Sequence, residues 1–227
     1  MKLVNIETSR VTRIYPPDEI QPWGGFYAPA LAKAIVDHYE FQSPPSPNPE
    51  TPNSIILTGG RVLVDGSTPI NIKSLGLYPD GFIVDTYETA GSMAVAMEFE
   101  RWLVENFAFR YPKKSPRNLY DSNLIVDFDE DISRSLGILV SMGQAIGGAL
   151  YQTYETYVPL GVHAIAFSAD PEYVTTHGIQ FKTDFSIVRR LGHPHSGNRY
   201  FCTAPLPNRT HFDLLINLEN IALGRIA

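Results

Sequence analysis

The spacing of hydrophobic positions changes along the chain and predicts a strand, a helix and a second strand in its middle. Residues 81–86 are rich in β-branched and aromatic side chains, which is typical of a strand. Over residues 89–107 apolar side chains recur every three or four positions, which indicates an amphipathic helix. Over residues 119–128 apolar and polar side chains alternate, which is typical of a second strand. If both strands run parallel in one sheet, residues 81–128 form a β-α-β unit.

The helix predicted over residues 89–107 has two chemically different faces. Its apolar face is formed by Val95, Phe99, Trp102, Leu103 and Phe107. Three charged residues fall together on the other side, namely Glu98, Arg101 and Glu105. We therefore expect the first set to be buried and the second to be solvated.

Further elements are predicted on both sides of this unit. Helices are expected over residues 27–41 and 210–223. Successive short strands are expected over residues 2–6, 10–15, 54–57, 61–64, 70–77, 161–168 and 181–191. Because short turns join antiparallel neighbours, the predicted fold class is α+β. It is a mixed, mainly antiparallel sheet with the β-α-β unit and three to four helices packed on it.

Length and composition predict one α+β domain over residues 1–227. A proline-rich loop interrupts it at residues 43–52, where five of ten positions are proline. The charged fraction of 19% is low and favours a subunit of an assembly, since interfaces are depleted in charge. The net charge of -6 argues against nucleic acid as a partner.

The expected compartment follows from cysteine usage and from the absence of long apolar runs. Cys202 is the one cysteine, so no internal disulfide is possible and a reducing environment is expected. No secretory signal is visible near Met1, and the longest uncharged stretch is interrupted by polar residues and glycines. We therefore expect a cytoplasmic protein that does not cross a membrane.

The most unusual stretch is a second long helix, predicted over residues 131–154. It has no charged residue between Arg134 and Glu155. Its small residues fall in two rows, Gly137, Ser141 and Ala145 in one and Gly143 and Gly147 in the other. A helix without a charged side is expected to be buried nearly all round, and interior glycines indicate close backbone approach. The helix is expected to lie under the sheet of its own subunit, to pack against a second copy, or to do both.

Two other groups of residues suggest chemistry. A basic loop carries Arg110, Lys113, Lys114 and Arg117 and is suited to phosphate or an acidic surface, although a solvated connection is the favoured interpretation. Asp85 and Asp127 end the two strands of the β-α-β unit, where parallel strands would bring both carboxylates to one edge to bind Mg²⁺. The commoner role of such carboxylates is helix capping.

Histidines and the cysteine supply weaker candidates. His193 and His195 would share a metal with His211 or Cys202 only if the fold brought them together. A turn-rich surface loop is the favoured interpretation of residues 193–198.

We therefore expect a non-enzymatic subunit that self-associates or joins a larger protein assembly without a cofactor. The alternative is a divalent-metal-dependent hydrolase of a phosphate ester, with Asp85 and Asp127 as Mg²⁺ ligands. No nucleophile elbow, dinucleotide fingerprint or zinc-protease helix is present, so the sequence leans away from an enzyme.

Overall fold

The computed structural model describes residues 1–20, 28–43, 54–64, 66, 68–156, 160–177, 181 and 183–225. Its strands are β1 Lys2–Ile14, β2 Ile55–Val64, β3 Thr68–Tyr78, β4 Gly81–Asp85, β5 Arg117–Asp127, β6 Ala164–Phe167, β7 Phe185–Arg189 and β8 Arg199–Ala204. Its helices are α1 Pro17–Ile20, α2 Ala28–His38, α3 Thr89–Phe107, α4 Gly137–Tyr154, α5 Pro171–His177 and α6 Asn208–Ala222, with 3-10 turns η1 Ile132–Ser135 and η2 His195–Gly197. Residues 44–52 of the predicted proline-rich loop lie outside the described residues.

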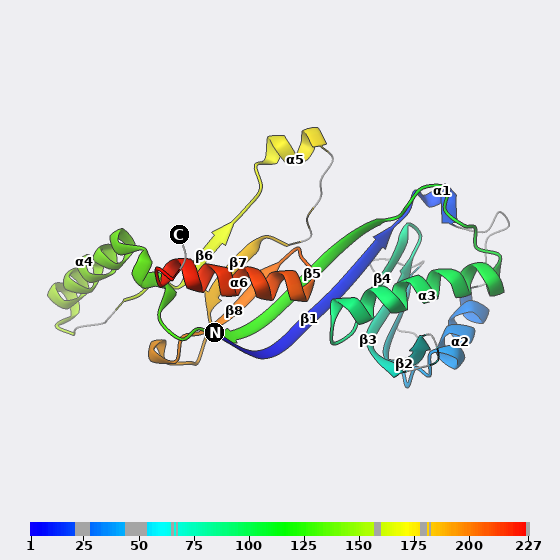
Figure 1. Cartoon of the computed structure of the whole chain (residues 1–227), viewed down its shortest axis with the longest axis horizontal. Coiled ribbons are helices and arrows are strands. Elements are labelled where there is room, and N and C mark those ends of the chain that lie inside the picture. The colour runs from blue at the N-terminus through cyan, green and yellow to red at the C-terminus, as the bar shows by residue number, and fades with distance from the viewer. Residues whose placement is uncertain are drawn as a thin grey trace. The chain divides into compact units, whose positions relative to one another are not determined.

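The strands form an eight-stranded antiparallel sheet in the order β2-β3-β4-β1-β5-β8-β7-β6, which confirms the α+β fold class (Figure 1). β4, α3 and β5 are the predicted β-α-β unit. β4 and β5 lie on either side of β1, and β1 is antiparallel to β4. Strands on either side of a common antiparallel neighbour run in the same direction, so the unit encloses β1 between its two strands.

Contacts divide the chain into two compact units, described separately below. Unit 1 comprises residues 1–7 and 123–227, and unit 2 comprises residues 8–122. The single domain expected over residues 1–227 stays a prediction.

β1 corrects the prediction of two short strands joined by a turn at residues 7–9. It is continuous from Lys2 to Ile14 because nothing in that stretch favours a turn and residues 10–14 pair in register with β4. The Ser9 backbone N–H donates to Asp85 Oδ1 at 3.3 Å, and its hydroxyl donates to the Thr86 carbonyl at 2.5 Å.

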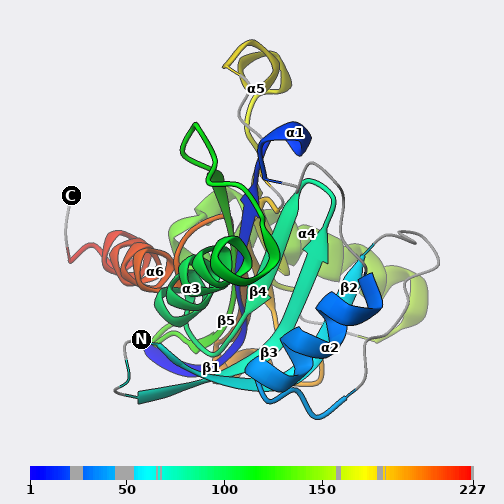
Figure 2. The same ribbon diagram turned by 90° about the vertical axis from the view of Figure 1, so that its right-hand side faces the viewer.

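In unit 2, α2 and α3 pack on one face of the strands and share one apolar core (Figure 2). The predicted apolar face of α3 is confirmed, since Val95, Phe99 and Leu103 are fully buried. Glu98 was expected on the solvated face, and that prediction is wrong. It is buried, accepts a hydrogen bond from the Tyr39 hydroxyl and lies 3.3 Å from His38 Nε2. The Glu98 carboxylate can be buried because hydrogen bonds satisfy its oxygens.

β2 is also continuous, although two strands with a turn at Gly59 and Gly60 were predicted. The buried side chains change from odd positions such as Leu57 to even positions such as Val62. Gly59 lies between them with φ +72°, a conformation that glycine adopts without steric cost. The strand therefore keeps its pairing with β3 while presenting both halves to one core.

Unit 1 has a separate core formed by β5, β7, β8 and α6. Its buried members are Leu124, Val126, Phe128, Ile132, Ile187, Tyr200, Cys202 and Leu215. The strands predicted over residues 161–168 and 181–191 correspond to β6 and β7, which form an antiparallel pair, and α6 begins at Asn208 rather than at residue 210. In Figure 1, α4 and α5 stand off the strands of this unit.

Residues 131–154 do not form one helix as predicted. Asp131 Oδ1 accepts hydrogen bonds from the backbone N–H and the hydroxyl of Ser133, which closes the short turn η1. Leu136 then leaves helical geometry at φ -95° and ψ 56°, and α4 begins at Gly137. None of the described helices is long and apolar enough to cross a membrane.

Replacing Gly81 by alanine tests the tight start of β4. Gly81 has φ +157°, and a Cβ there would lie 2.0 Å from the carbonyl oxygen of Arg13. We expect Gly81→Ala to lower the free energy of unfolding by about 3 kcal/mol, because backbone must move. Denaturation followed by tryptophan fluorescence measures it. Gly59→Ala is the control, since its φ is also positive but its Cβ meets nothing within 4 Å, and about 1 kcal/mol is expected. Equal losses would contradict this explanation.

Candidate functional site

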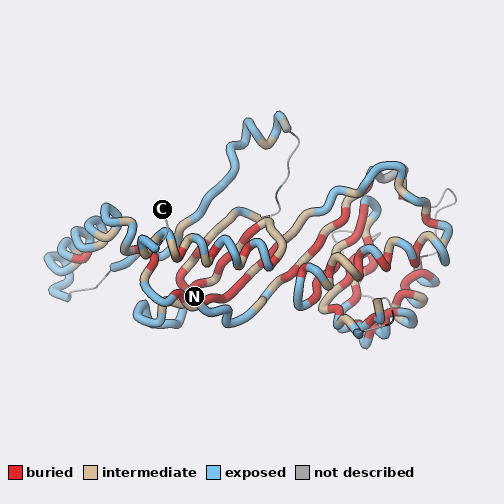
Figure 3. Tube along the Cα trace, in the orientation of Figure 1, coloured by how far each residue is buried: buried red, intermediate tan, exposed pale blue. Residues whose placement is uncertain are grey.

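The uncharged helix α4 lies almost entirely exposed in the single chain (Figure 3). Every residue of α4 is described, and Gly147 alone is buried. Ile138 is 77% exposed, Met142 55% and Ile146 48%. The expectation that this helix lies buried inside its own subunit is therefore wrong. Packing against a second copy, the other possibility, stays a prediction.

One side of α4 is covered by the chain that follows it. Val140, Gly143, Gly147 and Leu150 fall on this side at helical spacing, and none of them is exposed. A Cβ at Gly143 would lie 2.8 Å from the backbone oxygen of Leu160. Gly143 therefore has a role within the chain, where the missing side chain admits the returning backbone at Leu160, and Gly147 on the same side is buried.

The other side of α4 presents an apolar stripe. Ile138, Met142, Ala145 and Ala149 follow one another at intervals of four, three and four residues and are all exposed. This is the spacing of a seam between two helices. Leu139 and Ile146 widen the stripe; we call these six residues the α4 stripe.

Small residues border the α4 stripe. A Cβ at Gly137 would meet no atom within 4 Å, so the space beside this residue is open. Ser141, one turn later, is exposed. The Ser141 hydroxyl donates to the Gly137 carbonyl at 3.1 Å, so it has a partner within its own helix. Of the five residues predicted at an interface, Gly137, Ser141 and Ala145 thus remain open, whereas Gly143 and Gly147 face their own chain.

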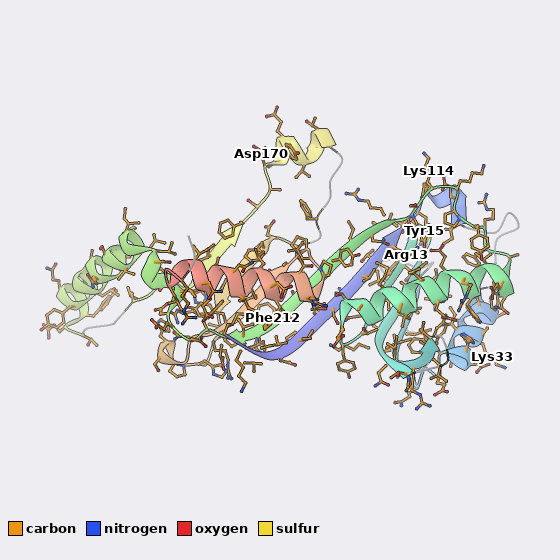
Figure 4. All side chains as sticks on the ribbon, viewed as in Figure 1. Arg13, Tyr15, Lys33, Lys114, Asp170 and Phe212 are labelled. Atoms are coloured by element: carbon orange, nitrogen blue, oxygen red, sulfur yellow. The ribbon has the colours of Figure 1, made fainter. Side chains whose placement is uncertain are left out.

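The predicted basic loop lies on the surface of unit 2. Lys113, Lys114 and Arg117 are exposed, and Arg110 is partly buried. Lys114 is labelled in Figure 4. The Arg110 backbone N–H donates to the Ile20 carbonyl at 2.9 Å, which ties the loop to α1. Three of the four cations thus lie on the connection between α3 and β5, and Arg117 is the first residue of β5.

The two aspartates predicted to bind Mg²⁺ belong to different units, and each faces an arginine. Asp85 in unit 2 lies 3.4 Å from Arg10, and Asp127 in unit 1 accepts two hydrogen bonds from Arg199 at 2.7 and 2.8 Å. The bonds from Arg199 hold the pKa of Asp127 below its usual value. Among the described residues, no three His, Cys, Asp or Glu side chains gather as metal ligands.

Sequence reasoning missed a buried ionic contact in unit 1. Arg189 is 5% exposed and lies 2.8 Å from Asp131, with its guanidinium over the ring of Tyr200. Burial works against the charge of Asp131, but hydrogen bonds from Ser133 and the charge of Arg189 outweigh it and lower its pKa. Nothing in the local pattern indicated a distant partner.

A second missed cluster lies in unit 2, beside a cavity of about 440 Å³. Arg13 donates to the Tyr15 hydroxyl at 3.0 Å and to Glu100 at 2.6 Å, and Tyr15 also donates to Glu100 (Figure 4). Burial raises the pKa of Tyr15. All three groups are satisfied by one another, which is the arrangement of a structural network.

The histidines and the cysteine of unit 1 have different environments. His193 and His195 are exposed around η2, whereas Cys202 and His211 are buried. Burial raises the pKa of the Cys202 thiol to about 12 and lowers that of His211 to about 4. Cys202 is therefore a thiol rather than a thiolate at neutral pH, and it lacks nucleophilic activation.

Neither a protein-family model nor a curated protein sequence matches this chain. Among the described residues, the α4 stripe gathers several exposed apolar side chains on one helix, which is typical of a contact surface.

His211 predicts a specific loss of stability in acid. Its folded pKa of about 4 lies below the ordinary 6.5, so the unfolded chain binds a proton that the folded chain does not. The free energy of unfolding should fall by about 3 kcal/mol as pH drops through that window. In His211→Leu this dependence of the free energy of unfolding on pH should vanish. The dependence due to Asp127 and Asp131 should remain. Urea denaturation followed by circular dichroism measures it, and identical slopes in both proteins would refute the assignment.

Replacing Asp127 tests the alternative metal site. We expect Asp127→Ala to cost about 1 kcal/mol of stability, because a partly exposed bidentate pair is lost. Calorimetric titration with Mg²⁺ should show the same negligible heat for the wild type and for this variant. Asp213→Ala, at an exposed carboxylate on α6, is the control. Saturable binding that disappears only in Asp127→Ala would support the hydrolase instead.

Proposed function

We propose that this protein is a non-enzymatic, cytoplasmic subunit that self-associates through the α4 stripe. The single observation that supports this proposal is an 18-residue helix without any charged residue that lies exposed in the isolated chain. A reducing location is part of the proposal, supported by the single, buried Cys202.

The driving force is removal of apolar surface from water. A helix that is uncharged on every side is normally buried, whereas most residues of α4 are exposed and Leu160 approaches it at Gly143. Each square ångström of apolar surface buried contributes about 25 cal/mol. A partner that covers the exposed side chains of Ile138, Met142 and Ile146 therefore stabilises the helix itself.

A second copy of the chain fits this surface on three grounds. α4 carries no charge, so nothing repels when the same surface meets itself across a two-fold axis. The spacing of the α4 stripe matches a seam between two helices. The small side chains of Gly137, Ser141 and Ala145 allow two helix backbones to approach closely. Attachment to a different protein would use the same surface and is separated from self-association by experiment.

A charge placed in the α4 stripe tests the proposal. We expect Met142→Glu to weaken self-association by on the order of tenfold or more, because a carboxylate would be buried without a partner. Light scattering and mass photometry across a micromolar concentration series measure the effect. Gln144→Glu is the matched control, because it adds the same charge to an exposed position of α4 outside the stripe. A wild-type chain that is strictly monomeric would contradict self-association.

A further inference from the structure

β6 ends the sheet order in unit 1, and its outer edge is a second surface that is independent of α4. It pairs with β7 in the register Ala164 to Val188, Ile165 to Ile187, Ala166 to Ser186 and Phe167 to Phe185. No other described strand neighbours it. Ala164, Ala166 and Phe167 are exposed.

The backbone of β6 shows which groups face outward. The Arg189 N–H donates to the His163 carbonyl at 2.8 Å, so these two residues face each other as a hydrogen-bonded pair. Such pairs alternate along an antiparallel ladder, which assigns Ile165 and Phe167 to the bonds with β7. The N–H and C=O groups of Ala164 and Ala166 therefore point away from β7, along the open edge.

The strand at the other end of the sheet order, β2 in unit 2, is protected in ways that β6 is not. The Arg61 N–H donates to the Tyr39 carbonyl at 2.7 Å, and the Gln42 N–H donates to the Gly59 carbonyl at 3.2 Å. Arg61 also forms an ion pair with Glu40 at this edge. Natural sheets protect edge strands by cover and charge. Residues 163–168 contain no acidic residue, lysine, arginine or proline.

We propose that β6 pairs antiparallel with β6 of a second copy, about a two-fold axis at Ile165. In this register Ala164 of one protomer faces Ala166 of its partner, and each such pair exchanges both of its N–H···O bonds. All outward backbone groups of the two alanines are then satisfied. The sheet continues from one protomer into the next.

The side chains favour a second copy over a foreign strand. In this register each hydrogen-bonded pair consists of two alanines, whose methyl groups neither clash nor repel across the strand pair, while Ile165 faces Ile165 of the second copy and His163 faces Phe167. Like charges directly opposite one another would be destabilising, and the edge has none. This surface does not rest on the α4 stripe. With two different two-fold contacts, each protomer would meet two neighbours and the assembly would exceed a dimer.

Paired substitutions at the two alanines test the register. Ala164→Lys with Ala166→Lys places lysine opposite lysine twice, and we expect this variant to weaken the β6 contact by on the order of tenfold or more. Ala164→Lys with Ala166→Glu places lysine opposite glutamate twice, and the contact should be retained. Both positions are exposed and their outward N–H groups do not bond β7, so both variants should fold alike. Circular dichroism and thermal unfolding check this.

Mass photometry of the full-length variants, alone and combined with Met142→Glu, separates the two surfaces. The proposal predicts a smaller assembly for the lysine pair, wild-type mass for the lysine–glutamate pair, and a monomer when the lysine pair is combined with Met142→Glu. If the lysine pair keeps wild-type mass, the β6 contact is overturned while the α4 proposal stands. If both β6 variants lose mass equally, symmetric self-pairing is overturned in favour of another strand. If Met142→Glu changes nothing while the lysine pair does, the α4 proposal fails and β6 stands.

Discussion

β1 is hydrogen-bonded between two neighbours, and this pairing imposes the main constraint on the fold. The backbone groups of such a strand bond to its two neighbours, and its buried polar side chains must also find partners in the protein. Ser9 bonds to the residues that end β4, and Arg13 bonds to Glu100 on α3. These contacts orient α3 with respect to β1 and β4 within unit 2. The same helix then brings Glu98 to Tyr39, which joins α2 to the core.

The chain distributes charge and apolar surface in an unusual way. Glu98, Arg13 and Arg189 are buried and bonded, while Ile138 and Met142 are more than half exposed. Burying a charge is costly unless it is paired, and each of these three has a partner. No comparable compensation exists for apolar side chains in water. The buried charges are thus explained within one chain, whereas the exposed apolar residues of α4 are the ones that the proposed self-association would cover.

Both candidate contact surfaces belong to unit 1 and make different physical demands. The α4 stripe needs removal of apolar side chains from water, which is not directional. The β6 edge needs backbone hydrogen bonds, which determine both direction and register. Two helices that meet through the α4 stripe can rotate slightly against each other and remain in contact. Two β6 strands cannot, because rotation would break their hydrogen bonds. Together they would specify an assembly with defined geometry, whereas the α4 stripe alone would determine only that the chains associate.

The sequence by itself determined the elements whose signal is local. The apolar face of α3 and the strands before and after it follow from side-chain period, and the α+β class follows from their order. The α4 residues were recognised as an uncharged helix, although its start at Gly137 depends on the turn closed by Asp131.

Only the tertiary structure decided where groups distant in sequence meet. It placed Glu98 inside, joined Arg189 to Asp131, kept Asp85 and Asp127 in separate units and left α4 outside the core. The reason is physical. The spacing of apolar and polar side chains shows which residues favour burial or a polar partner. Whether the same chain provides that burial or that partner depends on packing between elements far apart in sequence.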